Sequence, residues 1–104
     1  MILPTRPESS IQKDVMAHAW RRGLLAIKQG GGGPFGHVGW PDVLIVLPDK
    51  HCFWIEFKEP MKGVEAELQK ERKASLTKLG HTVYLICDVA TGKYVIDREL
   101  ENCK

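Results

Sequence analysis

Two apolar runs joined by a turn place the tightest constraint on the fold of this chain. The first run, residues 42–47, has the sequence DVLIVL, and the second, residues 51–58, has the sequence HCFWIEFK. Between them stands Pro48-Asp49-Lys50, in which proline and aspartate favour a turn. Short runs rich in β-branched and aromatic residues on either side of a turn predict a β-hairpin. The chain is therefore expected to fold around an antiparallel pair of strands.

Helical and strand patterns alternate through the rest of the chain. Apolar residues recur at helical spacing through residues 11–20, which predicts a first helix. Its expected N-cap is Thr5, with Glu8 at the capping-box position, and its expected end is Arg21-Arg22-Gly23. The other expected elements are a strand at 24–28, a glycine-rich loop at 29–40, the hairpin, a charged helix at 64–79, a strand at 83–87, a turn at 91–92 and a short strand at 93–96. This αβββαβ order with a short C-terminal strand predicts an α/β protein with a mixed four-stranded sheet flanked by helices, in which the strands around the second helix are parallel.

Length and composition favour one domain and exclude several classes of protein. The 104 residues, of which 43% are hydrophobic and 27% charged, suit a single soluble domain over residues 1–104. A net charge of +2 gives no global basic field, although it is compatible with a local basic face. No apolar run approaches the roughly 20 residues of a membrane span, and the N-terminus MILPTRPESS is too short and too polar for a signal peptide. The cysteines are odd in number and lack a C-x-x-C pair, which predicts reduced thiols in a cytoplasmic protein.

Charged side chains at the ends of the hairpin strands suggest a metal site. Glu56 and Lys58 share a strand face with Trp54, because side chains alternate along a strand. Asp42 begins the first strand, so the hairpin brings it towards Glu56. Two neighbouring carboxylates repel each other unless a cation lies between them, and Mg²⁺ and Mn²⁺ prefer oxygen ligands. With Lys58 available to hold a water or a phosphate, the pattern predicts metal-assisted hydrolysis of phosphodiester bonds.

The dipeptide Pro-Asp occurs twice, and the hairpin distinguishes the two copies. Asp49 is in the turn, at the opposite end of the second strand from Glu56, so Asp42 is the predicted site residue. If Asp42 and Glu56 lie opposite each other, the loop between the strands has three residues. Such a loop needs a left-handed residue, for which Lys50 is a poor fit. A strained Lys50, a β-bulge near the turn, or an Asp42 just before regular pairing would reconcile these demands, and we expect one of the last two.

The residues around this site resemble a known family of nucleases. Pro41-Asp42 followed by Glu56-Phe57-Lys58 is similar to the motif of the PD-(D/E)xK nuclease superfamily. The glycine-rich loop, the segments GWPDVLIV and FWIEFKEP, and a charged helix carrying Gln69 together resemble the virus-type replication-repair nuclease (VRR-NUC) domain, in its stand-alone phage and bacterial form. This resemblance implies a restriction-endonuclease-like fold.

The resemblance extends over most of the chain. Glu8 and Gln12 on the first expected helix also match the pattern of the family, so the similarity covers about residues 8–88. One position departs from it. The family commonly has an aromatic residue three positions after the glutamine, and Arg72 stands there in this chain. The departure bears on the packing of the second helix rather than on the metal site.

The resemblance implies a DNA endonuclease that depends on Mg²⁺ or Mn²⁺. The implied metal ligands are Asp42, Glu56, the backbone carbonyl of Phe57 and, directly or through water, Glu8. Lys58 would orient or activate the attacking water, and Gln69 would order Lys58 or the surroundings of the metal. We expect a structure-selective enzyme acting on branched DNA, such as four-way (Holliday) junctions in phage replication, recombination or repair. Two sites are needed to cut a symmetric junction, so a homodimer in the bacterial or phage-infected cytoplasm is expected.

Each of these residues also has a structural explanation. Asp42 fits a turn cap, Glu56 and Lys58 fit an ion pair on an edge strand, and Glu8 fits the capping box. Gln12 and Gln69 fit solvated helix surfaces. Two other functions are therefore considered. One is a flap, nicking or degradative nuclease, including one that acts on RNA, and the other is a non-catalytic module that binds nucleic acid.

Overall fold

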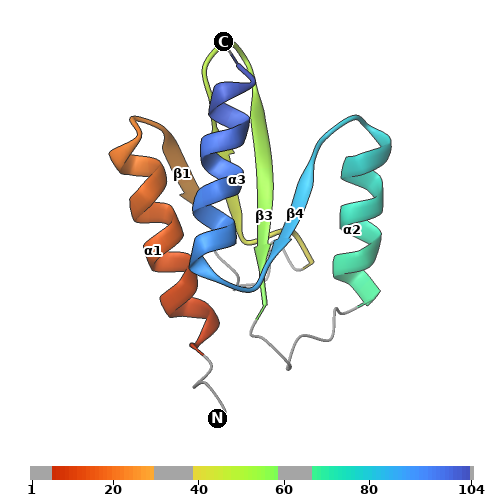
Figure 1. The fold of residues 1–104 in the computed structure, drawn as a ribbon. Coiled ribbons are helices and arrows are strands. Elements are labelled where there is room, and N and C mark those ends of the chain that lie inside the picture. Colours follow the sequence, from red (N-terminus) through yellow and green to blue (C-terminus); the bar gives the residue numbers. More distant parts are fainter. Residues whose placement is uncertain (1–5, 30–38, 59–66, 104) are drawn as a thin grey trace.

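The secondary structure elements follow the order αβββαβα in a computed structural model that describes residues 6–29, 39–58 and 67–103 (Figure 1). In chain order they are α1 (Glu8–Arg21), β1 (Leu25–Lys28), β2 (Val43–Val46), β3 (Cys52–Phe57), α2 (Glu67–Lys78), β4 (Val83–Ile86) and α3 (Val89–Glu101). The predicted class is confirmed, since three helices flank one mixed four-stranded sheet. None of the helices in these ranges has the length and apolar character to cross a membrane.

The sheet is built on the predicted hairpin. Its strand order is β1-β2-β3-β4, with β1, β2 and β3 antiparallel in turn and β4 parallel to β3. The connection through α2 therefore joins parallel strands, as expected. Leu44 pairs with Trp54, the register that turns the side chains of Asp42 and Glu56 towards the same face. Because β2 begins at Val43, Asp42 lies just before regular pairing, which is one of the two expected arrangements.

The hairpin turn contains the strained lysine rather than a bulge. The N–H of Leu47 donates to the carbonyl of His51 at 2.9 Å and closes a three-residue loop over 48–50. Asp49 and Lys50 have φ angles of 58° and 69°, in the left-handed region that costs about 1–2 kcal/mol per residue. The expected β-bulge is wrong, because the strands pair regularly up to this turn. A one-residue slip would turn the buried side chains of β2 out of the core, at about 1.5–3 kcal/mol each, so the register outweighs the strain.

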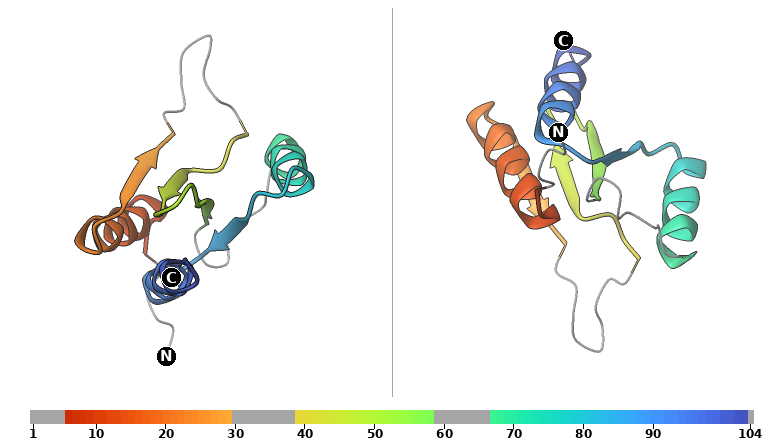
Figure 2. Two further views of the ribbon diagram at one scale, coloured as in Figure 1. Left: turned by 90° about the horizontal axis from the view of Figure 1, so that it is seen from above. Right: turned by 60° about the horizontal axis from the view of Figure 1, so that its bottom comes forward.

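Helices α1 and α3 cover one face of the sheet, and α2 lies beyond β4 (Figure 2). The core between these two helices and the sheet consists of buried apolar side chains, including Ile11, Val15, Val43, Ile45, Phe53, Ile55, Phe57, Val95 and Ile96. The two helices approach closely at Gly92, where a Cβ atom would stand 2.6 Å from Cγ2 of Val15. A glycine is therefore required at the point where α3 crosses α1.

The C-terminal prediction is wrong, because residues 89–101 form helix α3 instead of a turn at 91–92 and a strand at 93–96. The side chain of Asp88 caps the helix by accepting the N–H of Thr91 at 2.7 Å. Val95 and Ile96 then recur at helical spacing from Gly92 and face α1 and the sheet. The glycine that suggested a turn serves the helix contact described above.

The start of α1 also differs from the prediction. The helix begins at Glu8 with Pro7 as its N-cap, so the expected N-cap position is wrong, and Thr5 itself lies outside the described residues. Its end is confirmed, with Arg22 as C-cap and Gly23 at a φ of 80°. Most of the glycine-rich loop and the expected first residues of the second helix lie outside the described residues.

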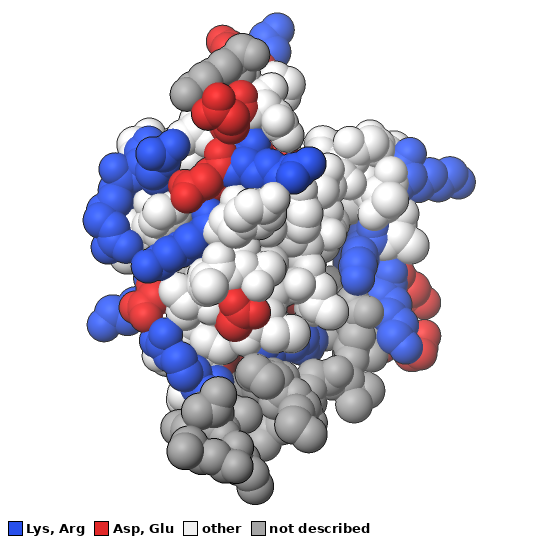
Figure 3. Space-filling view, in the orientation of Figure 1, with Lys and Arg blue, Asp and Glu red and all other residues white. Residues whose placement is uncertain are grey.

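Charged side chains gather at two sides of the molecule. Figure 3 shows Lys and Arg side chains over α1 and over α2, with Asp and Glu side chains among them and a mostly uncharged surface between the two groups.

Candidate active site

The end of the hairpin opposite its turn gathers the predicted acidic residues. Asp42 is half-buried in front of β2, and its Oδ2 accepts the backbone N–H of Phe57 at 2.7 Å. The carboxylate thus accepts the hydrogen bond that a backbone carbonyl of β2 would accept if the regular strand pairing continued. This bond fixes the carboxylate beside the last residues of β3. Burial raises the pKa of the Asp42 carboxyl above its ordinary value, while the N–H of Phe57 and the charges of Lys58 and Lys28 act to lower that pKa.

Glu56 is a buried carboxylic acid one residue before Phe57. It is only 1% exposed, and it stands in the middle of the sheet, between β2 and β4, with Leu85 as its partner on β4. Full burial excludes the alternative of an exposed ion pair on an edge strand. A carboxylate at this depth is costly to ionise unless positive charge compensates it. Asp42 and Glu56 together therefore favour a cationic ligand at this end of the sheet.

Lys58 and Gln69, which the family resemblance placed in the site, are in contact with each other. The Nζ of Lys58 donates to Oε1 of Gln69 on α2 at 3.2 Å. The backbone N–H of Lys58 donates to the carbonyl of Ile86 at 3.0 Å, which fixes the lysine to the end of β4. The ammonium group is thus held from two elements, and it is close enough to Asp42 to act on the pKa of that carboxyl.

Two tryptophans and an arginine attach α2 beside this site. The rings of Trp40 and Trp54 lie 6.0 Å apart, and the guanidinium of Arg72 lies 5.4 Å from the centre of the Trp40 ring. The arginine that departs from the family pattern therefore packs against an aromatic residue supplied by the loop before β2. Gly39 permits the close approach, because its φ is 85° and a Cβ atom there would stand 2.5 Å from Cγ of Leu68.

The next residues are Glu8 and Gln12 of α1, which match the pattern of the family. Glu8 is half-buried in the first turn of α1, and Gln12, one turn later, is only 8% exposed. Gln12 is thus not the solvated residue of the alternative interpretation. Among the residues that the structure describes, no group of three or more His, Cys, Asp or Glu side chains is arranged to hold a metal. The role of Glu8 as a ligand therefore stays a prediction.

One neighbour of the site was missed by the sequence analysis. Lys28, the last residue of β1, pairs with Val43, and its charge opposes the rise in the pKa of Asp42 that burial causes. The next residue, Gln29, donates its N–H to the carbonyl of Asp42 at 2.8 Å. The only signal in the sequence was a lysine at the end of an apolar run. That lysine indicates a neighbour of Asp42 only once β1 is known to pair with β2.

The donor groups present fit a hard divalent cation. The carboxylates of Asp42 and Glu56 and the carbonyl of Phe57 are all oxygen donors, the type that Mg²⁺ and Mn²⁺ prefer. A cation beside Asp42 would also offset the burial that disfavours its charged form. Asp49, the rejected candidate, is exposed in the hairpin turn at the other end of the strands.

No protein-family model and no curated protein matches this chain. A solved structure described as "VRR_NUC domain" does match it, with a TM-score of 0.71 over 86% of this chain and 94% of that chain. This chain has the VRR-NUC fold. The two sequences are 20% identical, so the likeness concerns the fold, and it confirms the resemblance at that level. In this VRR-NUC fold, the ends of β2 and β3 carry Asp42, Glu56 and Lys58.

Proposed function

We propose that this protein is a Mg²⁺- or Mn²⁺-dependent nuclease of the PD-(D/E)xK type that hydrolyses phosphodiester bonds in DNA. One observation carries the proposal. The carboxylate of Asp42 is tied by a 2.7 Å hydrogen bond to Phe57, so that it stands beside the Glu56-Phe57-Lys58 segment in a VRR-NUC fold. Two carboxylates and a lysine at the ends of adjacent strands suit this chemistry better than a stable core, because buried charges cost free energy.

Four groups would hold the metal. They are the carboxylates of Asp42 and Glu56, the carbonyl of Phe57 and, directly or through water, the carboxylate of Glu8. The bound ion would lower the pKa of a water and offset the negative charge of the phosphorane-like transition state. The hydrogen bond from the N–H of Phe57 to Asp42 holds these two residues together, and the protein thereby fixes the positions of their oxygens.

Lys58 would position the water or a phosphate oxygen. An ammonium group can donate three hydrogen bonds, so its bond to Gln69 is compatible with contact to a substrate. Gln69 would act as a positioning residue that limits where the ammonium can point. Since Gln69 belongs to α2, the docking of that helix through Arg72 and Trp40 would also affect the site.

Branched DNA is the proposed substrate class. A domain of 104 residues has little surface with which to read a long sequence, so selection by the shape of the DNA is the simpler alternative. A homodimer with two sites facing one four-way junction would cut both strands symmetrically. Light scattering on the free protein at micromolar concentration tests this assembly, and a strict monomer that nicks one strand of a junction would contradict it.

The test of the activity is a cleavage assay on a panel of labelled DNAs. The panel contains a four-way junction, a flap, a splayed arm, a linear duplex and a single strand, each with Mg²⁺, Mn²⁺, Ca²⁺ or chelator. We expect cleavage with Mg²⁺ and Mn²⁺, little or none with the larger Ca²⁺, and none in chelator. Branched substrates should be cut faster than the linear duplex. Efficient cutting in chelator would refute the metal mechanism, and no cutting of any substrate with either active metal would refute the nuclease.

A further inference from the structure

A groove runs along α1 on the side next to β1, beginning near the candidate active site. It has a volume of about 340 Å³ and is lined by residues of α1 and by the end of β1. The lining residues used below are Ser9, Gln12, Lys13, Met16, Trp20 and Lys28. From Ser9 to Trp20 the helix rises by about 16 Å. That length corresponds to roughly five nucleotides at the spacing of one strand in duplex DNA.

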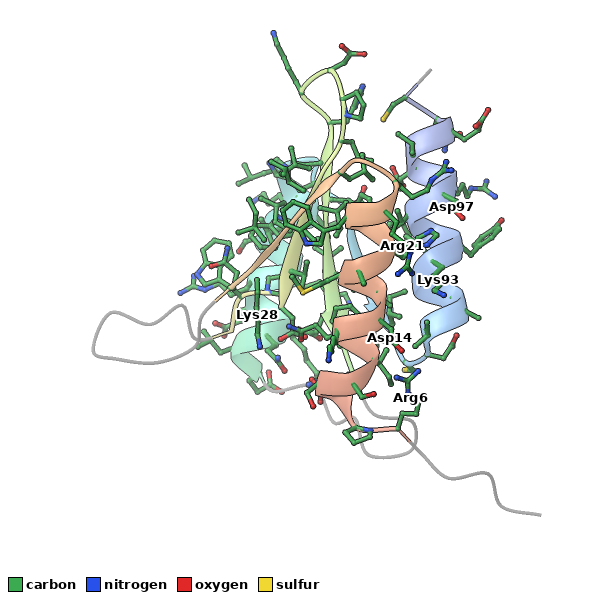
Figure 4. All side chains as sticks on the ribbon, turned by 90° about the vertical axis from the view of Figure 1, so that its left-hand side faces the viewer. Arg6, Asp14, Arg21, Lys28, Lys93 and Asp97 are labelled. Atoms are coloured by element: carbon green, nitrogen blue, oxygen red, sulfur yellow. The ribbon has the colours of Figure 1, made fainter. Side chains whose placement is uncertain are left out.

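The charge of this groove is suited to a polyanion. Lys13 and Lys28 line it and are exposed, while Ser9 and Gln12 add hydrogen-bonding groups between them. No acidic residue is among the described residues that line it. Asp14 of α1 lies away from the groove, on the side towards α3, and pairs with Arg6, while Asp97 of α3 pairs with His18 (Figure 4).

Lys28 connects the groove with the candidate active site. It lies beside α1 in Figure 4, and it pairs with Val43, the residue that follows Asp42. A strand whose phosphate is at Asp42 and Glu56 would reach the groove by passing the end of β1 at Lys28, because the groove is on the α1 side of the sheet and the two carboxylates belong to its other face.

The far end of the groove presents an aromatic surface. Trp20 is 53% exposed although it is a large apolar side chain, and Met16 forms the groove wall next to it. Proteins that bind single strands combine a cationic groove for the phosphates with aromatic rings on which unpaired bases stack. A fully paired duplex has no base free to stack in this way.

We propose that this groove, between α1 and β1, binds an unpaired strand of the nucleic-acid substrate, with phosphates at Lys13 and Lys28 and a base stacked on Trp20. The identity of the ligand rests on the proposed nuclease function. The proposal adds that an unpaired arm next to the cleavage site strengthens binding of the substrate, and it names the surface that recognises this arm.

Binding measurements test the groove separately from catalysis. The probes are two fluorescein-labelled DNA hairpins, one blunt and one with a tail of ten unpaired thymidines, measured by fluorescence anisotropy in chelator. The test variants are Trp20→Ala and Lys13→Gln. Their controls are Tyr94→Ala, which removes an exposed aromatic ring from α3, and Lys50→Asn, which removes one positive charge at the hairpin turn and suits the left-handed backbone there. Circular dichroism melting verifies that each variant is folded.

We expect Trp20→Ala to weaken binding of the tailed hairpin by roughly five-fold to a hundred-fold, the range of one base stacking contact. Binding of the blunt hairpin should change little. Lys13→Gln should make the dependence of log affinity on log salt concentration shallower by about 0.7 for the tailed probe, as expected for the loss of one phosphate contact with a single strand. The two controls should behave as the wild type on both probes.

The proposal is overturned if Trp20→Ala binds the tailed hairpin as the wild type does, or if it weakens both hairpins equally. It is also overturned if the only effect of Trp20→Ala is a change of oligomeric state, because Trp20 would then belong to a contact between copies of this chain. A protein that cleaves nothing with any metal, yet loses tail-dependent binding in both variants, would lack the proposed activity and keep the proposed groove. A protein that cleaves DNA, but in which both variants bind the tailed hairpin as the wild type does, would have the proposed activity and lack the proposed groove.

Discussion

Replacing Asp42 by two different residues separates its structural role from its catalytic role. In the native protein Oδ2 of Asp42 accepts the N–H of Phe57 at 2.7 Å, and Phe57 is fully buried. Asp42→Asn keeps a side-chain oxygen that can accept this hydrogen bond and removes the charge. Asp42→Ala removes both the charge and the acceptor, so the N–H of Phe57 loses its partner.

The expected difference in stability follows from this one bond. A buried donor left without an acceptor costs about 1–3 kcal/mol. In a domain of 104 residues, 1 kcal/mol shifts the melting temperature by about 4–8 °C, so Asp42→Ala should melt about 5–20 °C below Asp42→Asn. Cleavage should be lost in both variants, because both lack the carboxylate that would hold the metal.

Thermal unfolding in chelator, followed by circular dichroism, measures this difference, and the cleavage assay runs on the same samples. Asp49→Asn is the matched control. It removes one carboxylate at the hairpin turn, where asparagine suits the left-handed backbone, and it should melt and cut like the wild type. Equal melting temperatures for the two Asp42 variants would refute the structural role of the hydrogen bond. An active Asp42→Asn together with an inactive Asp49→Asn would show that the wrong aspartate was chosen.

Three further predictions follow from particular contacts. Burial raises the pKa of Asp42, so its contribution favours the folded state at low pH and is lost as pH rises through that pKa. Asp42→Asn should therefore gain stability relative to the metal-free wild type as the pH is raised from acidic to neutral, measured by melting at each pH. Gly92→Ala should destabilise the fold by about 1–3 kcal/mol in urea titrations, because the new Cβ would meet Val15 at 2.6 Å, and an unchanged midpoint would contradict the close packing of α1 and α3. Gln69→Ala should lower kcat, because it frees Lys58 without touching a metal ligand. The rise in melting temperature caused by Mg²⁺ should stay the same, and its loss would show that Gln69 helps to hold the metal.

The hairpin and the position of Asp42 beside the end of β3 could be predicted because they depend on local rules. Side chains alternate along a strand, so Glu56 and Trp54 had to share a face, and the choice of Asp42 over Asp49 followed from which end of the strand each occupies. The register then followed from the demand that two carboxylates lie on one face. Gln69 was added by the family resemblance rather than by any local rule, and it does contact Lys58.

The parts that could not be predicted depend on contacts between distant segments. Gly92 indicated a turn by composition, but the close approach to Val15 on α1 makes it a helical residue. Lys50 takes a left-handed conformation because the burial of the β2 side chains fixes the register, which outweighs the preference of one loop residue. Arg72 finds the ring of Trp40, 32 positions earlier in the chain, and no periodicity within α2 reveals such a pair.

The central claim is that the carboxylates at the ends of β2 and β3 form the metal centre of a nuclease. Single-turnover cleavage of a four-way junction with Mg²⁺ tests it most directly, with wild type, Glu56→Gln, Asp42→Asn and Asp49→Asn at equal concentration. The account predicts cutting by the wild type and by Asp49→Asn, and a loss of at least a hundred-fold in rate for the other two, about 2.7 kcal/mol or more in the barrier. Wild-type rates in Glu56→Gln or Asp42→Asn, with both variants folded, would contradict it.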